Sequence, residues 1–323
     1  MIKDRLESGE VLVLDGAIGT ELENHGIPQL HDASWAECLG THPEIVQKVH
    51  EDYVKAGADI ITTNTYSSGP NVLRKINQGA DIEKWNSVAV ELAIRARDNA
   101  QLDREIYVAG SVSAFGNGAM RYQGIKDGVQ WGETDALILK SNFLQQIDIL
   151  VKAGVDFILL ELLGAGVDDV QLAVETTSGC DVPVCLALSG IVFPDDDEIW
   201  LQTTDGESGL AKTDRFTDAI ERISGLNLLA LLTHHLEIDL VNQALAEIKK
   251  QWQGPAGVYP NRTGHWNGKQ WVFVENVTPN GYAELARDWI NEGAQIIGGC
   301  CGVSPAHISA VSEMLKENSA PSN

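Results

Sequence analysis

The sequence KAGADII at residues 55–61 recurs, with changes, as KAGVDFI at residues 152–158 and as NEGAQII at residues 291–297. In each copy a helical stretch ends at Gly, the residue that best tolerates the left-handed conformation found just after a helix. The residues after the Gly are mostly apolar, which is typical of a buried parallel strand. The repeated unit predicts an α/β protein in which helices and strands alternate.

The same pattern, followed along the chain, gives eight strand candidates. They cover Val11–Asp15, Ile60–Tyr66, Tyr107–Ser113, Phe157–Leu163, Val184–Ser189, Leu228–Thr233, Ala256–Asn261 and Gln295–Gly299. Eight strands that alternate with helices favour a closed (β/α)8 barrel, the TIM barrel, over an open doubly wound sheet. We expect a single barrel domain over residues 1–318 and a disordered tail over residues 319–323.

Two long irregular segments, residues 114–134 and 191–216, each follow a predicted strand. In a barrel, such segments lie at the C-terminal face, where the active sites of these folds are found. We therefore expect both segments to cover the active site.

The charge balance is strongly acidic. The 323 residues include 23 Lys and Arg against 46 Asp and Glu, a formal net charge of −23. Such a surface repels nucleic acids and anionic membranes, so neither is expected as a partner. No apolar run approaches the roughly 18 residues that span a bilayer, and the charged N-terminus does not resemble a secretion signal. We expect a cytoplasmic protein, and homo-oligomerisation is left open.

Candidate metal ligands follow two predicted strands. His234 and His235 come after the sixth strand, and Cys300 and Cys301 come after the eighth, between glycines. Two Cys and one His are a suitable zinc set, because three protein ligands leave the fourth position open for substrate. The flanking glycines allow a ligand to approach closely. The alternative for each cysteine is a small buried side chain at a strand end.

Other polar candidates stand at the ends of the first, second and fourth strands. Asp15 and Gly16 end the first, Thr65 and Tyr66 end the second, and Glu161 lies inside the apolar fourth strand. A carboxylate in an apolar run needs a partner, and a substrate ammonium group would serve. Asp15 alone is also compatible with an ordinary turn before Gly16.

Five blocks of the sequence resemble the homocysteine S-methyltransferase family, which includes betaine- and S-methylmethionine-dependent enzymes. They are LDGAIGTEL at residues 14–22, AGADIITTNTY at residues 56–66, VAGS at residues 108–111, VYPN at residues 258–261 and IGGCCG at residues 297–302. The resemblance covers nearly the whole chain, and the first and last blocks are the most specific. It implies a barrel enzyme of methionine biosynthesis that methylates homocysteine and uses zinc.

In that family three cysteines hold zinc, namely the vicinal pair and one cysteine on the sixth strand. This chain has no cysteine on the sixth strand, and counting back from the following helix places the position on His235. Because His is a competent zinc ligand, the resemblance implies a site of His235, Cys300 and Cys301, with His234 as the fallback ligand. It implies no catalytic residue beyond the metal site.

The resemblance also implies that Asp15, Gly16 and Glu161 hold the amino-acid group of the thiol acceptor, and Thr65 is a further candidate for substrate contact. The chain departs from the family near this expected pocket. It has ELLG at residues 161–164 where Glu-Thr and then Pro are usual, and VSAFG at residues 112–116 lacks the usual Gly-Pro. These departures bear on the identity of the acceptor more than on zinc or the fold.

A methyl-onium donor requires an aromatic wall for cation–π contact. Trp35, Tyr66 and Phe115 are the candidates, and Trp35 matches a Trp of betaine-using relatives. The expected mechanism is attack of a zinc-bound thiolate on the methyl group of a sulfonium or quaternary ammonium donor. The leaving group departs neutral, so no general acid is needed.

Three alternatives stay open. The first is a related thiol methyltransferase or demethylase with another acceptor or onium donor, such as dimethylsulfoniopropionate. The second is a zinc barrel hydrolase, which would need a general base beside the metal and usually more His and Asp ligands. The third is a barrel that binds a ligand without catalysis.

Overall fold

The computed structural model describes the chain except residue 32 and residues 116–132, 205–209, 263, 267–270, 274–276 and 320–323. Eight parallel strands form one sheet in the spatial order β1-β14-β11-β10-β5-β4-β3-β2. A parallel bridge between Leu14 and Ile60 joins β1 to β2 and brings the ends of the sheet together. The predicted (β/α)8 barrel is therefore confirmed. The strands are β1 (Leu12–Val13), β2 (Ile60–Thr62), β3 (Tyr107–Ser113), β4 (Phe157–Leu162), β5 (Val184–Leu188), β10 (Ala230–Glu237), β11 (Ala256–Asn261) and β14 (Ala294–Ile297).

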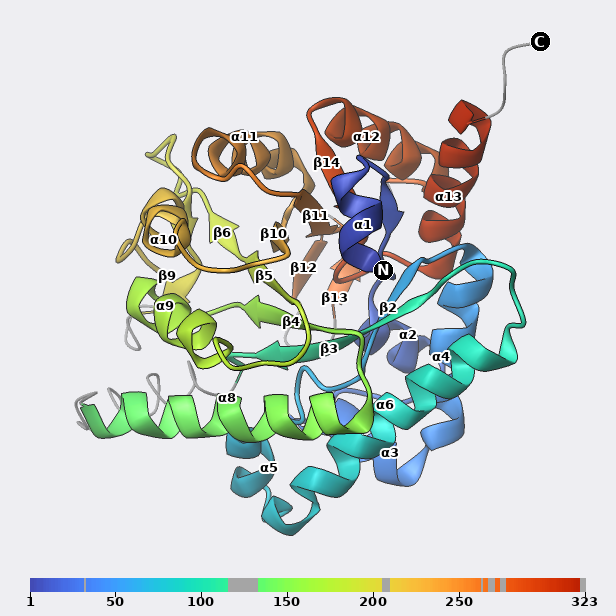
Figure 1. Cartoon of the computed structure of the whole chain (residues 1–323), viewed down its shortest axis with the longest axis vertical. Helices are drawn as coiled ribbons and strands as arrows, with labels where there is room; N and C mark the ends of the chain where they lie inside the picture. Colours follow the sequence, from blue (N-terminus) through green and yellow to red (C-terminus); the bar gives the residue numbers. More distant parts are fainter. Residues whose placement is uncertain are drawn as a thin grey trace.

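Helices surround the strands on the outside (Figure 1). They are α1 (Ile2–Glu7), α2 (Ile18–Asn24), α3 (Ser34–Thr41), α4 (Pro43–Ala56), α5 (Pro70–Lys75), α6 (Ile82–Asn99), α8 (Glu133–Ala153), α9 (Val167–Thr176), α10 (Phe216–Ile223), α11 (Val241–Gln251), α12 (Pro279–Asn291) and α13 (Pro305–Ser319). The glycines of the recurring unit, Gly57, Gly154 and Gly293, have φ angles of 104°, 101° and 98°. They end α4, α8 and α12 in the left-handed conformation that the sequence predicts.

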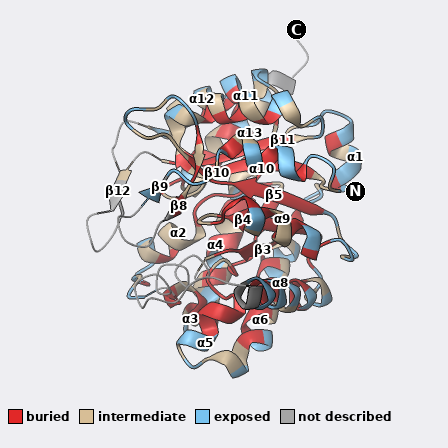
Figure 2. Cartoon of the chain, turned by 90° about the vertical axis from the view of Figure 1, so that its left-hand side faces the viewer, coloured by how far each residue is buried: buried red, intermediate tan, exposed pale blue. Residues whose placement is uncertain are grey.

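Successive residues of the strands point to opposite sides of the sheet. Tyr107, Phe157 and Leu159 pack inside the barrel, whereas Val108 and Ile158 pack outward against the helices. Both sides of the sheet are therefore apolar, which explains why the strands show no alternation of polar and apolar residues. Figure 2 shows the buried residues on the strands and on the facing sides of the helices, with exposed residues on the outer turns.

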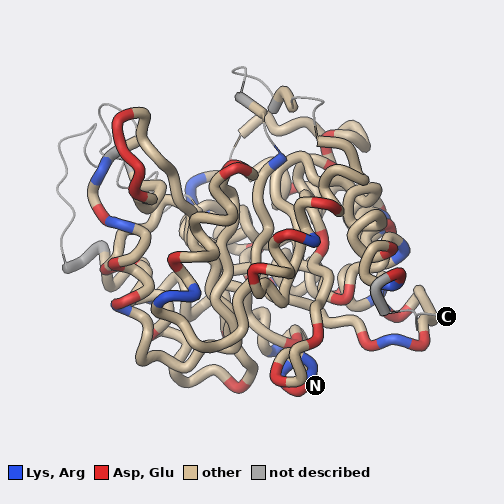
Figure 3. Tube along the Cα trace, turned by 90° about the horizontal axis from the view of Figure 1, so that it is seen from above, with Lys and Arg blue, Asp and Glu red and all other residues tan. Residues whose placement is uncertain are grey.

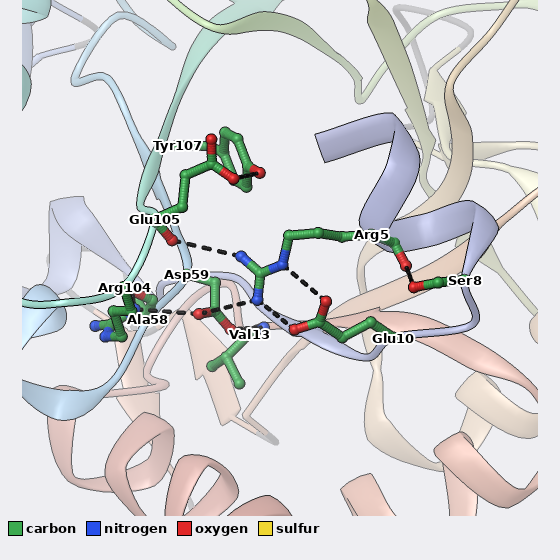
Figure 4. Close-up of polar contacts among 9 residues, drawn as sticks. All are labelled: Arg5, Ser8, Glu10, Val13, Ala58, Asp59, Arg104, Glu105 and Tyr107. Atoms are coloured by element: carbon green, nitrogen blue, oxygen red, sulfur yellow. Dashed lines mark hydrogen bonds and ion pairs between the residues drawn. The ribbon is translucent and has the colours of Figure 1, made fainter. Parts of the chain in front are cut away.

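The helix α1 covers the N-terminal end of the barrel. Its buried residues Ile2 and Leu6 belong to the apolar cluster inside the barrel. Arg5 anchors the helix: its Nε donates to Glu10 at 2.9 Å, and its guanidinium lies 3.7 Å from the Asp59 carboxylate (Figure 4). The contacts of α1 close the end of the barrel opposite the strand ends that carry the candidate site.

Short antiparallel ribbons lie between the barrel elements. Over residues 190–211, β6 (Gly190–Ile191) pairs with β7 (Trp200–Leu201), and β8 (Thr203–Thr204) pairs with β9 (Leu210–Ala211). A third ribbon, β12 (Gly264–Trp266) with β13 (Trp271–Phe273), follows β11. Most of the predicted loop at residues 114–134, and the predicted tail beyond Ser319, lie outside the described residues.

Among the described residues, no helix combines the length and apolar character that crossing a bilayer requires. Figure 3 shows Asp and Glu residues distributed around the whole trace, with Lys and Arg interspersed.

Candidate metal centre and substrate cavity

The side chains of His235, Cys300 and Cys301 converge at the C-terminal end of the barrel. His235 Nδ1 lies 3.6 Å from Cys300 Sγ and 3.7 Å from Cys301 Sγ, and the two sulfurs are 3.9 Å apart. Tetrahedral zinc with ordinary bond lengths separates two sulfurs by about 3.8 Å, and a sulfur from a nitrogen by about 3.6 Å. The three atoms therefore have the spacing of a zinc ligand set, and they form the one such group of three found in the described part of the chain.

The cysteines occupy a tight turn after β14. The amide of Cys300 donates to Pro260 O at 2.8 Å, and the amide of Cys301 donates to Asn261 Oδ1 at 3.1 Å, so the end of β11 fixes both. A Cβ on Gly299 would lie 2.1 Å from Val303 Cγ1. Only Gly fits this position without displacing the turn, which explains the glycine before the pair.

His235 reaches the cysteines through a break in β10. The pairing of β10 with β11 shifts register between His234 and Glu237, and His235 has a φ angle of 50°. The left-handed region is uncommon for a residue other than Gly, and such strain is often found at functional sites. The break turns the His235 ring toward the sulfurs, whereas the buried His234 ring packs 5.2 Å from the ring of Tyr259. The fallback ligand His234 is therefore outside the group of three.

The Cys300 thiol is poorly suited to carry negative charge by itself. The neighbouring Cys301 thiol and burial raise the pKa of the Cys300 thiol well above its ordinary value. A divalent cation reverses this preference, because coordination deprotonates a thiol outright. The donor set thus fits a zinc ion, which would balance the charge of two thiolates.

A cavity of about 310 Å³ opens beside the three ligands. Its wall includes Asp15 and Glu161, the two carboxylates expected to hold the acceptor. Both are buried and hydrogen-bonded. Thr62 donates to Asp15 through its backbone amide at 2.7 Å and its hydroxyl at 2.9 Å. Ser111 donates to Glu161, as does Tyr259 at 3.2 Å.

Burial raises the pKa of both carboxyl groups, that of Asp15 to about 8. The cost of burying their charge falls when a cation enters, so the pair is suited to an ammonium group of a ligand. Gly16 lies on the same wall, where a Cβ would come 2.3 Å from Val303 O.

The predicted aromatic residues also line this cavity. The rings of Tyr66 and Phe115 are 5.3 Å apart, and Trp35 contributes a further wall. The indole Nε1 of Trp35 is buried without a hydrogen-bond partner within the described residues. Thr65 is placed differently: it is fully buried outside the cavity wall, and its hydroxyl donates to Ser111 O.

Sequence reasoning missed several residues of the site. Thr62, Ser111 and Tyr259 hold the carboxylates, and Asn261 holds the cysteine turn. All four lie in blocks that resemble the family, at residues 56–66, 108–111 and 258–261, but their hydrogen-bond partners come from other strands or the turns after them. Glu23, on α2, also lies on the cavity wall and carries no motif that singles it out.

The model of the family described as homocysteine S-methyltransferase matches residues 12–315. The chain belongs to this family. Homocysteine S-methyltransferase 1 from Zea mays is 29% identical over 324 residues, which cover 96% of this chain and 95% of that protein. Selenocysteine Se-methyltransferase from Brassica oleracea var. italica is 28% identical, with coverage of 96% and 90%.

The crystal structure of the homocysteine methyltransferase MmuM from Escherichia coli, in its metallated form, shares the fold. It is 23% identical, covers 97% of this chain and 99% of that chain, and superposes with a TM-score of 0.74. The protein is a homocysteine S-methyltransferase-like methyltransferase with a candidate metal site of one His and two Cys.

Proposed function

We propose that the protein transfers a methyl group from a sulfonium or quaternary ammonium donor to homocysteine, giving methionine, with Zn²⁺ held by His235, Cys300 and Cys301. The spacing of these three ligand atoms is the observation that carries the proposal. When bound, Zn²⁺ lowers the pKa of a coordinated thiol, so that the thiol is held as a nucleophilic thiolate.

The residues of the chain supply position and charge. Asp15 and Glu161 bind the ammonium group of the acceptor, and Ser111 and Tyr259 orient the Glu161 carboxylate. This arrangement fixes the acceptor at its amino end and leaves the sulfur beside the metal ligands. Aligning two reactants in this way can contribute on the order of 7–11 kcal/mol to the lowering of a barrier.

The aromatic wall of Trp35, Tyr66 and Phe115 accepts the methyl-onium group of the donor. An aromatic face attracts such a cation without forming a bond to it, so the methyl group stays free to transfer. The donor leaves as a neutral thioether or amine, which needs no proton from the protein. This agrees with the high pKa values of Tyr66 and Tyr259, which keep both phenols protonated and available as hydrogen-bond donors.

A related thiol or selenol of another amino acid is the second candidate acceptor. The block ELLG at residues 161–164 departs from the Glu-Thr and then Pro that is usual in the family, and Leu163 of this block lies on the cavity wall. A methyl-transfer assay with homocysteine, cysteine and selenocysteine would rank these acceptors. If homocysteine stimulates methyl loss from none of S-methylmethionine, betaine and dimethylsulfoniopropionate, homocysteine is not the acceptor.

The metal assignment is tested by zinc analysis of protein purified without chelator. We expect about one zinc per wild-type chain. We expect each of the variants Cys300→Ser, Cys301→Ser and His235→Ala to lose most of the metal. Their activity should fall by roughly 100-fold or more. Cys180→Ser is the matched control, because Cys180 is partly buried and lies away from the cavity. Full zinc occupancy in all three ligand variants would contradict the proposal.

A further inference from the structure

One carboxylate on the cavity wall has no task in the proposed reaction. Glu23 lies on α2 and is partly buried, and its side chain has no hydrogen bond or ion pair within the described residues. Burial raises the pKa of this carboxyl group. A carboxylate so placed gains most from a positively charged ligand that enters the cavity.

The helix α2 places Glu23 beside the aromatic wall. Gly19 is four residues earlier, so it lies on the same face of the helix as Glu23. The ring of Trp35 packs on Gly19 so closely that a Cβ there would come 2.7 Å from Trp35 Cζ2. The absence of a side chain at Gly19 therefore makes room for the ring, and both Trp35 and Glu23 belong to the lining of the cavity.

Glu23 differs in its contacts from the two carboxylates expected to bind the acceptor. Asp15 and Glu161 stand at the ends of barrel strands and already accept hydrogen bonds from the protein. Glu23 is on a helix after the first strand and accepts none. Among the described residues, no Lys or Arg lines the cavity.

We propose that Glu23 is a specificity-determining residue that binds an ammonium group on the methyl donor, and so selects amino-acid sulfonium donors over onium donors that lack an ammonium group. The proposal rests on the proposed function, because it takes Trp35 as the wall that receives the onium group. Glu23 recognises the far end of the donor and takes no part in bond breaking. A partly buried ammonium–carboxylate contact of this kind changes affinity by about tenfold.

Two sulfonium donors distinguish recognition of the ammonium group by Glu23 from a general attraction of cations to the cavity. S-methylmethionine and dimethylsulfoniopropionate both carry a dimethylsulfonium group and a carboxylate, but only the first carries an ammonium group. Each would be titrated by calorimetry into zinc-loaded protein in the absence of any thiol. Glu23→Gln should weaken the binding of S-methylmethionine about tenfold and change that of dimethylsulfoniopropionate less than about twofold.

Glu21→Gln is the matched control. Glu21 lies on the same helix and is also partly buried, but it accepts a hydrogen bond from Asn24 and does not line the cavity. This variant should bind both donors as the wild type does. Equal weakening of both donors by Glu23→Gln, or no weakening of S-methylmethionine, would overturn the proposal.

Steady-state methyl transfer to homocysteine gives a second measurement. Glu23→Gln should raise KM for S-methylmethionine and leave kcat close to the wild-type value. A wild type that binds S-methylmethionine through Glu23 but methylates no thiol would refute the proposed function and support the role of Glu23. An unchanged KM in an active Glu23→Gln enzyme would refute the role of Glu23 alone.

Discussion

Asp15 shows how a single residue couples binding to stability. Burial raises its pKa to about 8, although Thr62 donates two hydrogen bonds to it. The folded pKa exceeds the unfolded value of about 3.9, so between these two pH values the native state binds one more proton than the unfolded chain. The free energy of unfolding therefore falls as pH rises through that window. Asp15→Asn should therefore be more stable than the wild type, by on the order of 2 kcal/mol at pH 7.5.

Urea denaturation of both proteins between about pH 5 and pH 8 measures this difference. The difference in the free energy of unfolding between the variant and the wild type should widen as pH rises. The variant should also lose measurable binding of homocysteine. A gap that stays constant with pH would show that the Asp15 charge does not limit stability.

His50 has the opposite pH behaviour. It is fully buried on α4, neither ring nitrogen has a partner within the described residues, and burial lowers its pKa to about 4. In the unfolded chain the imidazole takes up a proton near its ordinary pKa of about 6.5, whereas in the native state it stays neutral down to about pH 4. The free energy of unfolding therefore falls as pH drops through this window. His50→Leu should remove up to about 3 kcal/mol of that acid sensitivity.

Thermal denaturation between about pH 4 and pH 7 tests this, with His25→Leu as the control because His25 is exposed. Equal acid sensitivity in His50→Leu and the wild type would exclude His50 as a cause of acid unfolding.

At the residue scale, the sequence pointed to the three candidate metal ligands that the structure brings together, but it did not predict their geometry. The motif and the count along the following helix pointed to His235. Nothing in the sequence predicted its left-handed conformation, because that depends on where β10 leaves its register with β11. Thr65 and Glu23 illustrate the same limit: which side chains face the cavity follows from packing between strands and helices that are distant in sequence.

Among the elements, α1 closes the N-terminal end of the barrel. Leu6 is 2% exposed and packs among the inward-facing strand residues, and Arg5 ties the helix to Glu10 and Asp59. Leu6→Ala should destabilise the fold by about 2–4 kcal/mol through the cavity that it leaves. Arg5→Ala should cost less, about 1 kcal/mol, because its contacts are partly exposed.

Both variants should keep the zinc content of the wild type when folded, because α1 packs at the N-terminal end of the barrel, whereas the candidate ligands lie at the C-terminal ends of their strands. Urea denaturation and zinc analysis measure the two effects, with the exposed Lys3→Ala as the control. Loss of zinc at unchanged stability would show that α1 acts on the site directly.

The elements themselves were largely predictable. The limits predicted for Tyr107–Ser113 and Ala256–Asn261 match the observed strands. β10 extends to Glu237, beyond its predicted end, because His234 and His235 continue it without an apolar pattern. The ribbons β6–β9 and β12–β13 were not predicted, since strands of two or three residues have no periodicity to detect.

On the scale of the whole molecule, closure of the barrel explains why distant residues form one site. Asp15, Glu161, His235 and Cys301 lie on four different strands or the turns that follow them, and parallel strands deliver all four to the same end. The sequence predicted that these residues meet, because in a (β/α)8 barrel the residues at the C-terminal ends of the parallel strands lie at one face.

The net charge of −23 acts on the same scale. A field of this sign attracts a donor with a net positive charge and leaves a donor of zero net charge largely unaffected. Salt screens the field: the Debye length falls from about 30 Å at 0.01 M to about 3 Å at 1 M. KM for S-methylmethionine, which carries a net charge of +1 at neutral pH, should rise about threefold over this range.

Dimethylsulfoniopropionate, with no net charge, is the internal control for this effect. Its KM should stay constant over the same range of salt, because only the long-range attraction is screened. The local contact of Glu23 is partly buried and should persist at high salt. Glu23→Gln should therefore still weaken the binding of S-methylmethionine at 1 M salt, roughly as it does at low salt. An identical salt response of the two donors would show that the acidic surface does not contribute to donor capture, and would leave selection to the cavity wall alone.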